Sequence, residues 1–160
     1  MQPITAGINH YRSKNNRLKT QQEVIEIVKS NTPQRYKKYG TFTFEVANTS
    51  YLLYTYINGV CETTNTVNPG DYVITGPLNE QFALKPETFQ KRYRIVGDNV
   101  AEATGECFGA PYKGESFDFT APWGELTLCE NNDFLVSPDD SFSSAYRIEG
   151  EVFAKTYRPV

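Results

Sequence analysis

The sequence is poor in the residues that build catalytic and metal sites, with one histidine, His10, and three cysteines in 160 residues. A single histidine excludes multi-histidine metal sites and histidine-based triads inside the core. The cysteines, Cys61, Cys107 and Cys129, are odd in number and lack the Cys-x-x-Cys spacing of zinc sites and disulfide frameworks. We therefore expect reduced, buried cysteines, no bound metal and no cofactor.

The sequence also has few long hydrophobic runs. No stretch approaches the roughly 20 apolar residues that span a bilayer, and the first twenty residues lack the apolar run of about 7 to 15 residues of a secretory signal. These features predict a cytoplasmic protein without membrane contact. With 39% hydrophobic and 14% aromatic residues, the chain can form a core as one domain or as two units of about fifty residues.

Charge is distributed unevenly along the chain. Residues 1–40 hold eight Lys or Arg and two acids, a net charge of +6, whereas residues 98–151 hold twelve acids and two bases, a net charge of −10. A basic arm can bind phosphates, while an acidic body repels nucleic acid and attracts basic protein surfaces. The arm could also lie on the protein's own acidic face, an interpretation that needs no external partner and that charge patterning favours. If there is a partner, two classes stay open, a protein and a nucleic acid.

Two stretches of the chain match each other in order and in residue type, which indicates an internal duplication. Asp71–Thr75 aligns with Asp133–Ser137, and Phe82–Arg94 aligns with Tyr146–Arg158. A weaker match continues upstream, between residues 40–47 and 114–121. The second block holds five identities, which are Glu87/Glu151, Phe89/Phe153, Lys91/Lys155, Tyr93/Tyr157 and Arg94/Arg158. Turn residues, strand-forming runs and side-chain pairs four residues apart predict a β-hairpin followed by a short helix in each copy.

The fold class that follows is α+β and mostly β, with two small hairpin-plus-helix modules packed together. An apolar stripe within Thr20–Lys29 predicts a helix before them. We assign residues 1–39 to a basic arm and helix, 40–97 to the first module, 98–113 to a connecting segment and 114–160 to a second, degenerate module.

One segment carries a family resemblance. The run Pro69-Gly-Asp-Tyr-Val-Ile-Thr-Gly76, followed by Glu80–Tyr93 with its Lys-Pro-x-x-Phe-x-x-x-Tyr ending, resembles the small PGDYG-like modules of bacteriophage and bacterial proteins. The second copy is a degenerate version, with Asn131-Asn-Asp-Phe134 in place of Pro-Gly-Asp-Tyr. The resemblance covers about 100 of the 160 residues. It implies a β-rich accessory protein of phage type, and it implies no established activity and no catalytic residues.

Asp71 and Asp133 are equivalent by this repeat. An aspartate in such a turn most often accepts hydrogen bonds from the backbone of the turn, so we expect a structural role for both and name no catalytic residue. The alternative is a small-molecule binder or hydrolase at the cleft between the repeats. That alternative requires the two carboxylates to face each other across a pocket.

Aromatic residues, among them Tyr51, Tyr54 and Tyr56, exceed what two small cores can bury, so some should face solvent or a partner. We therefore predict a non-enzymatic protein that binds a cytoplasmic host protein through an acidic, aromatic-rich β surface. The candidate residues for this surface are Tyr112, Trp123, Glu125, Glu130, Asp139 and Asp140. The alternative partner is a nucleic acid, for which the candidate residues are Arg35, Tyr36, Lys37, Lys38, Arg92 and Arg94.

Overall fold

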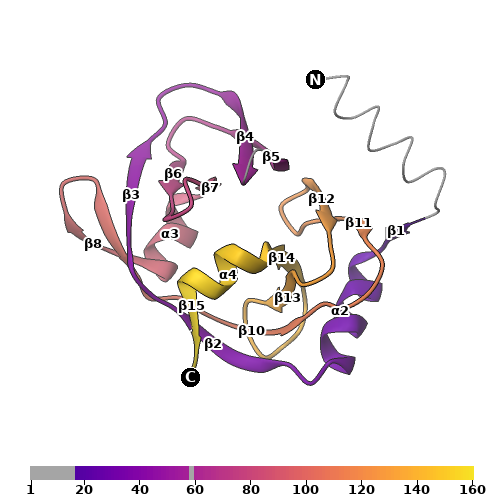
Figure 1. Cartoon of the computed structure of the whole chain (residues 1–160). Helices are drawn as coiled ribbons and strands as arrows, with labels where there is room; N and C mark the ends of the chain where they lie inside the picture. The colour runs from indigo at the N-terminus through magenta and orange to yellow at the C-terminus, as the bar shows by residue number, and fades with distance from the viewer. Residues whose placement is uncertain (1–16, 58–59) are drawn as a thin grey trace.

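The computed structural model describes residues 17–57 and 60–160, and these residues form an α+β fold that is mostly β (Figure 1). His10 and the first 16 residues of the basic arm lie outside these ranges. In chain order the elements are β1 (Leu18–Lys19), α2 (Gln21–Ser30), β2 (Gln34–Lys38), β3 (Thr41–Val46), β4 (Tyr51–Ile57), β5 (Val60–Val67), β6 (Tyr72–Thr75), β7 (Gln81–Leu84), α3 (Pro86–Arg92), β8 (Tyr93–Gly97), β9 (Val100–Ala103), β10 (Glu106–Pro111), β11 (Phe117–Thr120), β12 (Leu126–Cys129), β13 (Phe134–Ser137), β14 (Tyr146–Ile148), α4 (Gly150–Thr156) and β15 (Tyr157–Pro159).

Helix α2 begins at a capping box. The Thr20 hydroxyl accepts a hydrogen bond from Glu23 N (3.1 Å), and the Glu23 carboxylate accepts one from Thr20 N (2.8 Å). Val24, Ile25 and Val28 recur on one side of the helix and are buried. The helix therefore has one apolar stripe, and this stripe packs against β11 and β13.

Two five-stranded antiparallel sheets form the body of the molecule. Sheet I has the strand order β7-β6-β3-β9-β8, and sheet II has the order β14-β13-β10-β2-β15. In sheet I the chain runs from β6 through β7 and α3 into the edge strand β8, and in sheet II it runs from β13 through β14 and α4 into the edge strand β15. The two sheets therefore have the same layout, place for place.

The chain crosses between the sheets at two corresponding points. Strand β2 lies in sheet II and the next strand, β3, in sheet I, whereas β9 lies in sheet I and the next strand, β10, in sheet II. Lys38 N donates to Gly105 O (2.8 Å), and Ala103 N donates to Gly40 O (3.0 Å), so the two crossings are joined to each other. Strands from the expected arm and from the expected connecting segment, β2 and β10, thus pair with each other inside sheet II.

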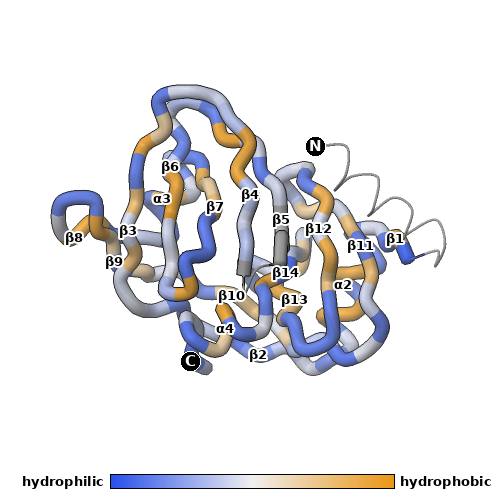
Figure 2. Tube along the Cα trace, turned by 45° about the horizontal axis from the view of Figure 1, so that its top comes forward, coloured by the Kyte–Doolittle hydropathy of each residue, from blue (hydrophilic) through white to orange (hydrophobic). Residues whose placement is uncertain are grey.

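A β-hairpin covers the outer face of each sheet, and a short helix covers the opposite face. In the β4–β5 hairpin, Leu53 packs with Val73 of sheet I. In the β11–β12 hairpin, which β1 extends in parallel, Phe119 packs in one cluster with Leu135 of sheet II and with α2. Strand β5 lies beside β12, so the two hairpins meet (Figure 2).

The weak upstream match between residues 40–47 and 114–121 is wrong as a structural correspondence. Strand β3 is the central strand of sheet I, whereas β11 lies in the outer hairpin. The strand at the place of β3 in sheet II is β10. A Phe-x-Phe pattern is common to both matched segments, and alternation of this kind marks any half-buried strand without identifying its neighbours.

A stack of three aromatic rings lies on the helix-bearing face of each sheet. The centroids are 4.1 and 5.4 Å apart in the stack Tyr72–Phe89–Tyr93 of sheet I, and 3.7 and 4.6 Å apart in the stack Phe134–Phe153–Tyr157 of sheet II. A fourth ring completes each cluster from a different strand. It is Phe44 of β3 in sheet I, but Tyr36 of β2 in sheet II, where the place of Phe44 is taken by Gly109.

Candidate functional site

Asp71 stands in the turn before β6 and is 4% exposed. Its carboxylate accepts a hydrogen bond from Asn68 N (2.9 Å) and pairs with the Lys85 ammonium (3.2 Å), whose side chain is 60% exposed. Gly70 precedes it with a φ of +91°, a conformation that glycine adopts without strain. The carboxylate therefore fixes the turn that leads into β6.

Asp133 does the same before β13. Its carboxylate accepts hydrogen bonds from Glu130 N (2.9 Å), Arg147 Nε (3.0 Å) and Gly150 N (3.2 Å). The predicted structural role of both aspartates is confirmed, because each one is buried in its own turn with its own cationic partner. They are therefore not available as a facing pair of catalytic carboxylates.

Two of the predicted protein-binding residues lie in the turn between β11 and β12. Trp123 is 58% exposed, and its ring centroid lies 5.7 Å from that of Tyr146. The Glu125 carboxylate accepts a hydrogen bond from Thr66 N of β5 (3.2 Å). Glu125 therefore joins the two outer hairpins, and Trp123 stands next to this junction.

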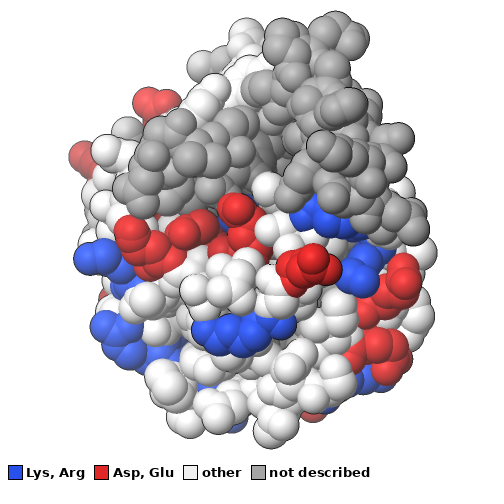
Figure 3. Space-filling view, turned by 45° about the vertical axis from the view of Figure 1, so that its right-hand side comes forward, with Lys and Arg blue, Asp and Glu red and all other residues white. Residues whose placement is uncertain are grey.

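The other predicted protein-binding residues lie at opposite ends of sheet II. Tyr112 and Glu130 adjoin the end where Pro111 pairs with Phe134, whereas Asp139 and Asp140 follow Ser137 at the other end. Four paired residues separate the two ends, which corresponds to roughly 10 Å or more along the strands. Figure 3 shows acidic, basic and uncharged side chains interspersed over the face in view. The structure therefore does not gather these residues into one acidic patch.

The predicted nucleic-acid residues are divided between the surface and the interior. Arg35 pairs with Glu106 (2.8 Å), and Arg94 pairs with Glu102. Lys37 is exposed, while the Tyr36 ring packs on Phe153. Arg92 is half-buried and donates to Glu106 O (2.8 Å), and Lys38 is buried. These six residues do not form one basic surface.

Lys38 instead occupies a polar centre between the two sheets. Its ammonium Nζ donates to the hydroxyl of Tyr93 (2.6 Å). Nζ also lies 4.6 to 5.7 Å from the centroids of four rings, which are Phe42, Phe82 and Tyr93 of sheet I and Tyr157 of sheet II. A lysine of β2 thus links sheet II to the aromatic cluster of sheet I.

The interior around Lys38 disfavours charged groups. Burial, together with the charge of Arg92, lowers the pKa of Lys38 to about 7, although the carboxylate of Glu80 acts in the opposite direction. Burial raises the pKa of Tyr146 and that of Cys107 to about 12. The Cys107 thiol is therefore protonated at neutral pH and is not an activated nucleophile.

A stripe of outward-facing side chains on β4 includes two of the tyrosines that the sequence analysis counted as surplus, Tyr54 and Tyr56. Leu52, Tyr54 and Tyr56 alternate with the buried Leu53 and Thr55, so they lie on the face of the hairpin that points away from sheet I. Leu52 is 44% exposed and Tyr56 is 52% exposed. We call Leu52, Tyr54 and Tyr56 the hairpin surface. The surplus of tyrosines was the only sequence signal that pointed to it.

The remaining site predictions concern metals, cysteines and membranes. In residues 17–57 and 60–160, no three metal-ligating side chains come together. Cys107 and Cys129 are free and buried there, whereas the side chain of Cys61 lies outside the described part of the chain. No helix within those ranges is long and apolar enough to cross a bilayer. Comparison of the chain with protein-family models, curated proteins and solved structures gives no match.

Proposed function

We propose that the chain is built from two duplicated β modules that have exchanged one strand each. The first unit would run from β2 to β8 and the second from β9 to β15, so that β8 and β15 occupy corresponding places. The support is that the strand registers of the two sheets correspond. The pair Tyr93–Ala103 of sheet I corresponds to the pair Tyr157–Lys38 of sheet II. Likewise, the pair Phe44–Ile74 of sheet I corresponds to the pair Gly109–Val136 of sheet II. The turn carboxylates Asp71 and Asp133 and the two aromatic stacks recur at the same places.

The exchange has a mechanical consequence. Each unit completes the other's sheet, because β2 pairs with β10 and β15 while β9 pairs with β3 and β8. The units cannot move apart without breaking these ladders. Side chains presented by the outer hairpins are therefore held on a rigid scaffold, which lowers the entropy that is lost when a partner binds.

On this scaffold, we propose that the protein is a non-enzymatic binding protein that recognises a protein partner through the hairpin surface. The observation that carries the proposal is the run Leu52, Tyr54 and Tyr56 on the outer face of β4, where alternation normally places polar residues. Tyrosine is favoured in recognition surfaces because it offers a large rigid area with a polar end. Trp123, which is also exposed, lies in the turn of the β11–β12 hairpin next to Glu125, whose carboxylate joins the two hairpins.

The test is affinity capture from host lysate with and without nuclease, using the wild-type protein and two matched variants. Leu52→Ser/Tyr56→Ser changes the hairpin surface, and Ile95→Ser/Val96→Ser changes two equally exposed apolar residues of β8. We expect a discrete protein that survives nuclease treatment, binds the β8 variant and is lost with the β4 variant. Capture of nucleic acid alone, or equal capture of the protein by both variants, contradicts the proposal.

A further inference from the structure

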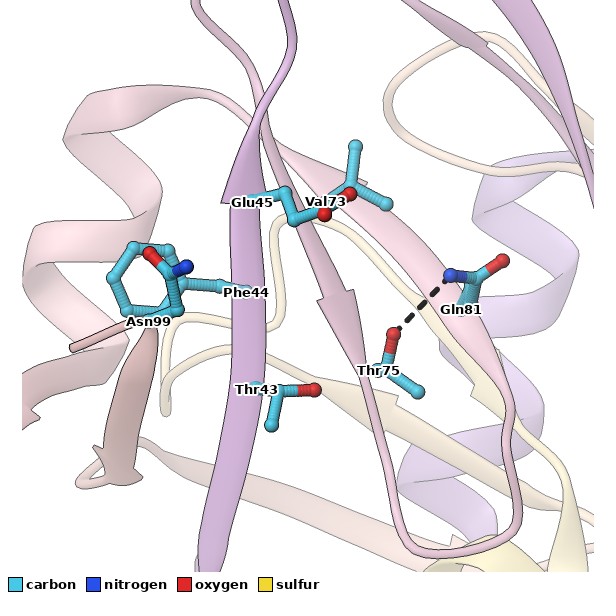
Figure 4. Close-up of a pocket in the computed structure, with 7 residues that line it drawn as sticks. All are labelled: Thr43, Phe44, Glu45, Val73, Thr75, Gln81 and Asn99. Carbon is cyan, nitrogen blue, oxygen red and sulfur yellow. Dashed lines mark hydrogen bonds between the residues drawn. The ribbon is translucent and has the colours of Figure 1, made fainter. Parts of the chain in front are cut away.

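A polar pocket of about 350 Å³ lies on the outer face of sheet I, where its lining residue Val73 packs with Leu53 of the β4–β5 hairpin. This volume is at the lower end of the range of about 300 to 1,000 Å³ in which small-molecule pockets fall. Figure 4 shows the side chains that line it, which are Thr43, Phe44, Glu45, Val73, Thr75, Gln81 and Asn99. The pocket is separate from the hairpin surface and does not depend on the function proposed above.

The sheet register aligns the polar groups of the pocket. Thr43 pairs with Thr75, and Thr75 pairs with Gln81, so their side chains form one row across β3, β6 and β7. Gln81 Nε2 donates to the Thr75 hydroxyl (3.1 Å), as Figure 4 shows. The next row along β3 begins with Glu45. The row therefore presents hydroxyl and amide groups at spacings of about 5 Å, which suits a ligand with several hydroxyl groups.

Asn99 closes one end of the pocket from a different element. It lies in the turn between β8 and β9 with a φ of +56°, and its carbonyl accepts a hydrogen bond from Phe44 N (3.0 Å). This bond holds the turn against β3, so the backbone of Asn99 is fixed beside the pocket, and its side chain lies next to the Phe44 ring (Figure 4). A site built on sheet strands and a tied turn is preorganised for binding.

The corresponding face of sheet II is filled. Phe108 occupies the place of Thr43, and its ring packs on Phe142 at a centroid distance of 6.2 Å. Leu135 occupies the place of Val73 and is buried in the cluster that includes α2. The same layout can therefore be closed with apolar side chains and a helix. Sheet I carries hydroxyl and amide groups on the corresponding face.

The charge of the lining groups restricts the ligand. Glu45 is the charged side chain among the lining residues, and it is exposed. A carboxylate beside hydroxyl and amide groups favours a cationic hydrogen-bond donor and disfavours an anion. We propose that this pocket binds a small polyhydroxylated ligand that carries a primary ammonium group, of the amino-sugar class.

The experiment is an NMR titration of the full chain with three sugars of the same skeleton, in which the chemical shifts of the backbone amides are measured. The probes are glucosamine, glucose and glucuronate, which differ in charge from positive through neutral to negative. We expect glucosamine to shift the amides of β3, β6 and β7 with a dissociation constant in the millimolar range. Glucose should bind about tenfold more weakly, because it lacks the charge-assisted hydrogen bond, and glucuronate should not bind.

Variants locate the site on the sheet. Glu45→Gln keeps the shape of the pocket and removes its charge, so glucosamine should then bind no better than glucose. Glu102→Gln is the matched control, because Glu102 is a glutamate of the neighbouring strand β9 outside the pocket. The Glu102→Gln protein should bind glucosamine with the affinity of the wild type. Absence of glucosamine binding at 50 mM, equal binding of glucuronate, or equal affinity of the Glu45→Gln protein each overturns the proposal.

Discussion

The buried amine of Lys38 makes the stability of the protein depend on pH in a direction that the structure fixes. Burial lowers the pKa of Lys38 from its ordinary value of 10.5 to about 7. Between these two pH values the unfolded chain binds a proton that the folded protein does not bind, so the free energy of unfolding rises with pH. Below pH 7 the folded protein also carries the buried charge, and the rise stops.

The size of the effect follows from the shift. One proton of difference corresponds to a slope of at most about 1.4 kcal/mol per pH unit, so Lys38 contributes a rise of roughly 3 kcal/mol between pH 6 and pH 9. Other groups titrate in the same range, since burial also raises the pKa of Cys107 to about 12 and that of Cys129 above its ordinary value. Those contributions are common to the wild type and to a Lys38 variant, so they cancel in the difference.

The assay is urea unfolding at pH 6 to 9 for the wild type, Lys38→Met and Lys37→Met. Methionine keeps most of the length of lysine and has no titrating group, while the exposed Lys37 is the matched control on the same strand. The stability of the wild type minus that of Lys38→Met should increase by about 3 kcal/mol from pH 6 to pH 9. The corresponding difference for Lys37→Met should stay flat. A flat difference for Lys38 would refute the reasoning, because the amine would then be solvated in the folded protein.

Further changes test the packing. Asp133→Asn leaves the buried Arg147 without its carboxylate and should cost about 3 to 5 kcal/mol in urea unfolding, whereas Asp71→Asn, whose partner Lys85 is exposed, should cost roughly 1 to 2 kcal/mol; equal losses would contradict this ranking. Tyr36→Ala removes the fourth ring of its cluster and should cost about 3 to 5 kcal/mol, while Tyr36→Phe should cost under about 1 kcal/mol by thermal unfolding. Thr20→Ala should lower stability by about 1 kcal/mol, and adding Glu23→Ala should lower it further, because the Glu23 carboxylate still accepts from the backbone N–H of residue 20 in the single variant. Leu52→Ser/Tyr56→Ser should change stability by no more than roughly 0.5 kcal/mol per residue, since neither side chain is buried.

Sequence patterns predicted those turns and helices whose stabilising contacts join residues that are close in the chain. Asp71 accepts the backbone hydrogen bond that its turn position indicated, and β6 follows it. The helix Pro86–Arg92 has proline in its first turn, as its sequence indicated. In both cases the decisive contacts lie within a few residues of each other, so a sequence pattern can contain all of the information.

Partners that are distant in the chain could not be predicted in this way. Strand β2 pairs with β10, with Tyr36 opposite Cys107 some seventy positions later. An alternating pattern states that a strand has a buried face, but it does not state which strand lies next to it. For this reason the sequence pattern pairs residues 40–47 with residues 114–121, although the strand that corresponds to β3 in sheet II is β10.

The sequence prediction placed Lys38 on the surface, although the alternation of residues in β2 indicates that it is buried. Tyr36 and Lys38 are two apart on β2, so they share the face that carries the aromatic cluster, while Arg35 and Lys37 point outward. The run of basic residues looked like a surface because charge was counted along the chain and not by face. Alternation alone would have placed one lysine inside.

The same position shows why the two halves cannot be chemically identical. In sheet I the residue at the place of Lys38 is Ala103, which opposes Tyr93 in the register as Lys38 opposes Tyr157. Lys38 reaches across from sheet II and donates to Tyr93. A lysine at both places would bring two ammonium groups to the same buried tyrosine pair, where each charge is already disfavoured by burial. A lysine at one place and an alanine at the other avoids this repulsion. The aromatic clusters show the same complementarity, because sheet II combines Tyr36 with Gly109, whereas sheet I combines Ala101 with Phe44.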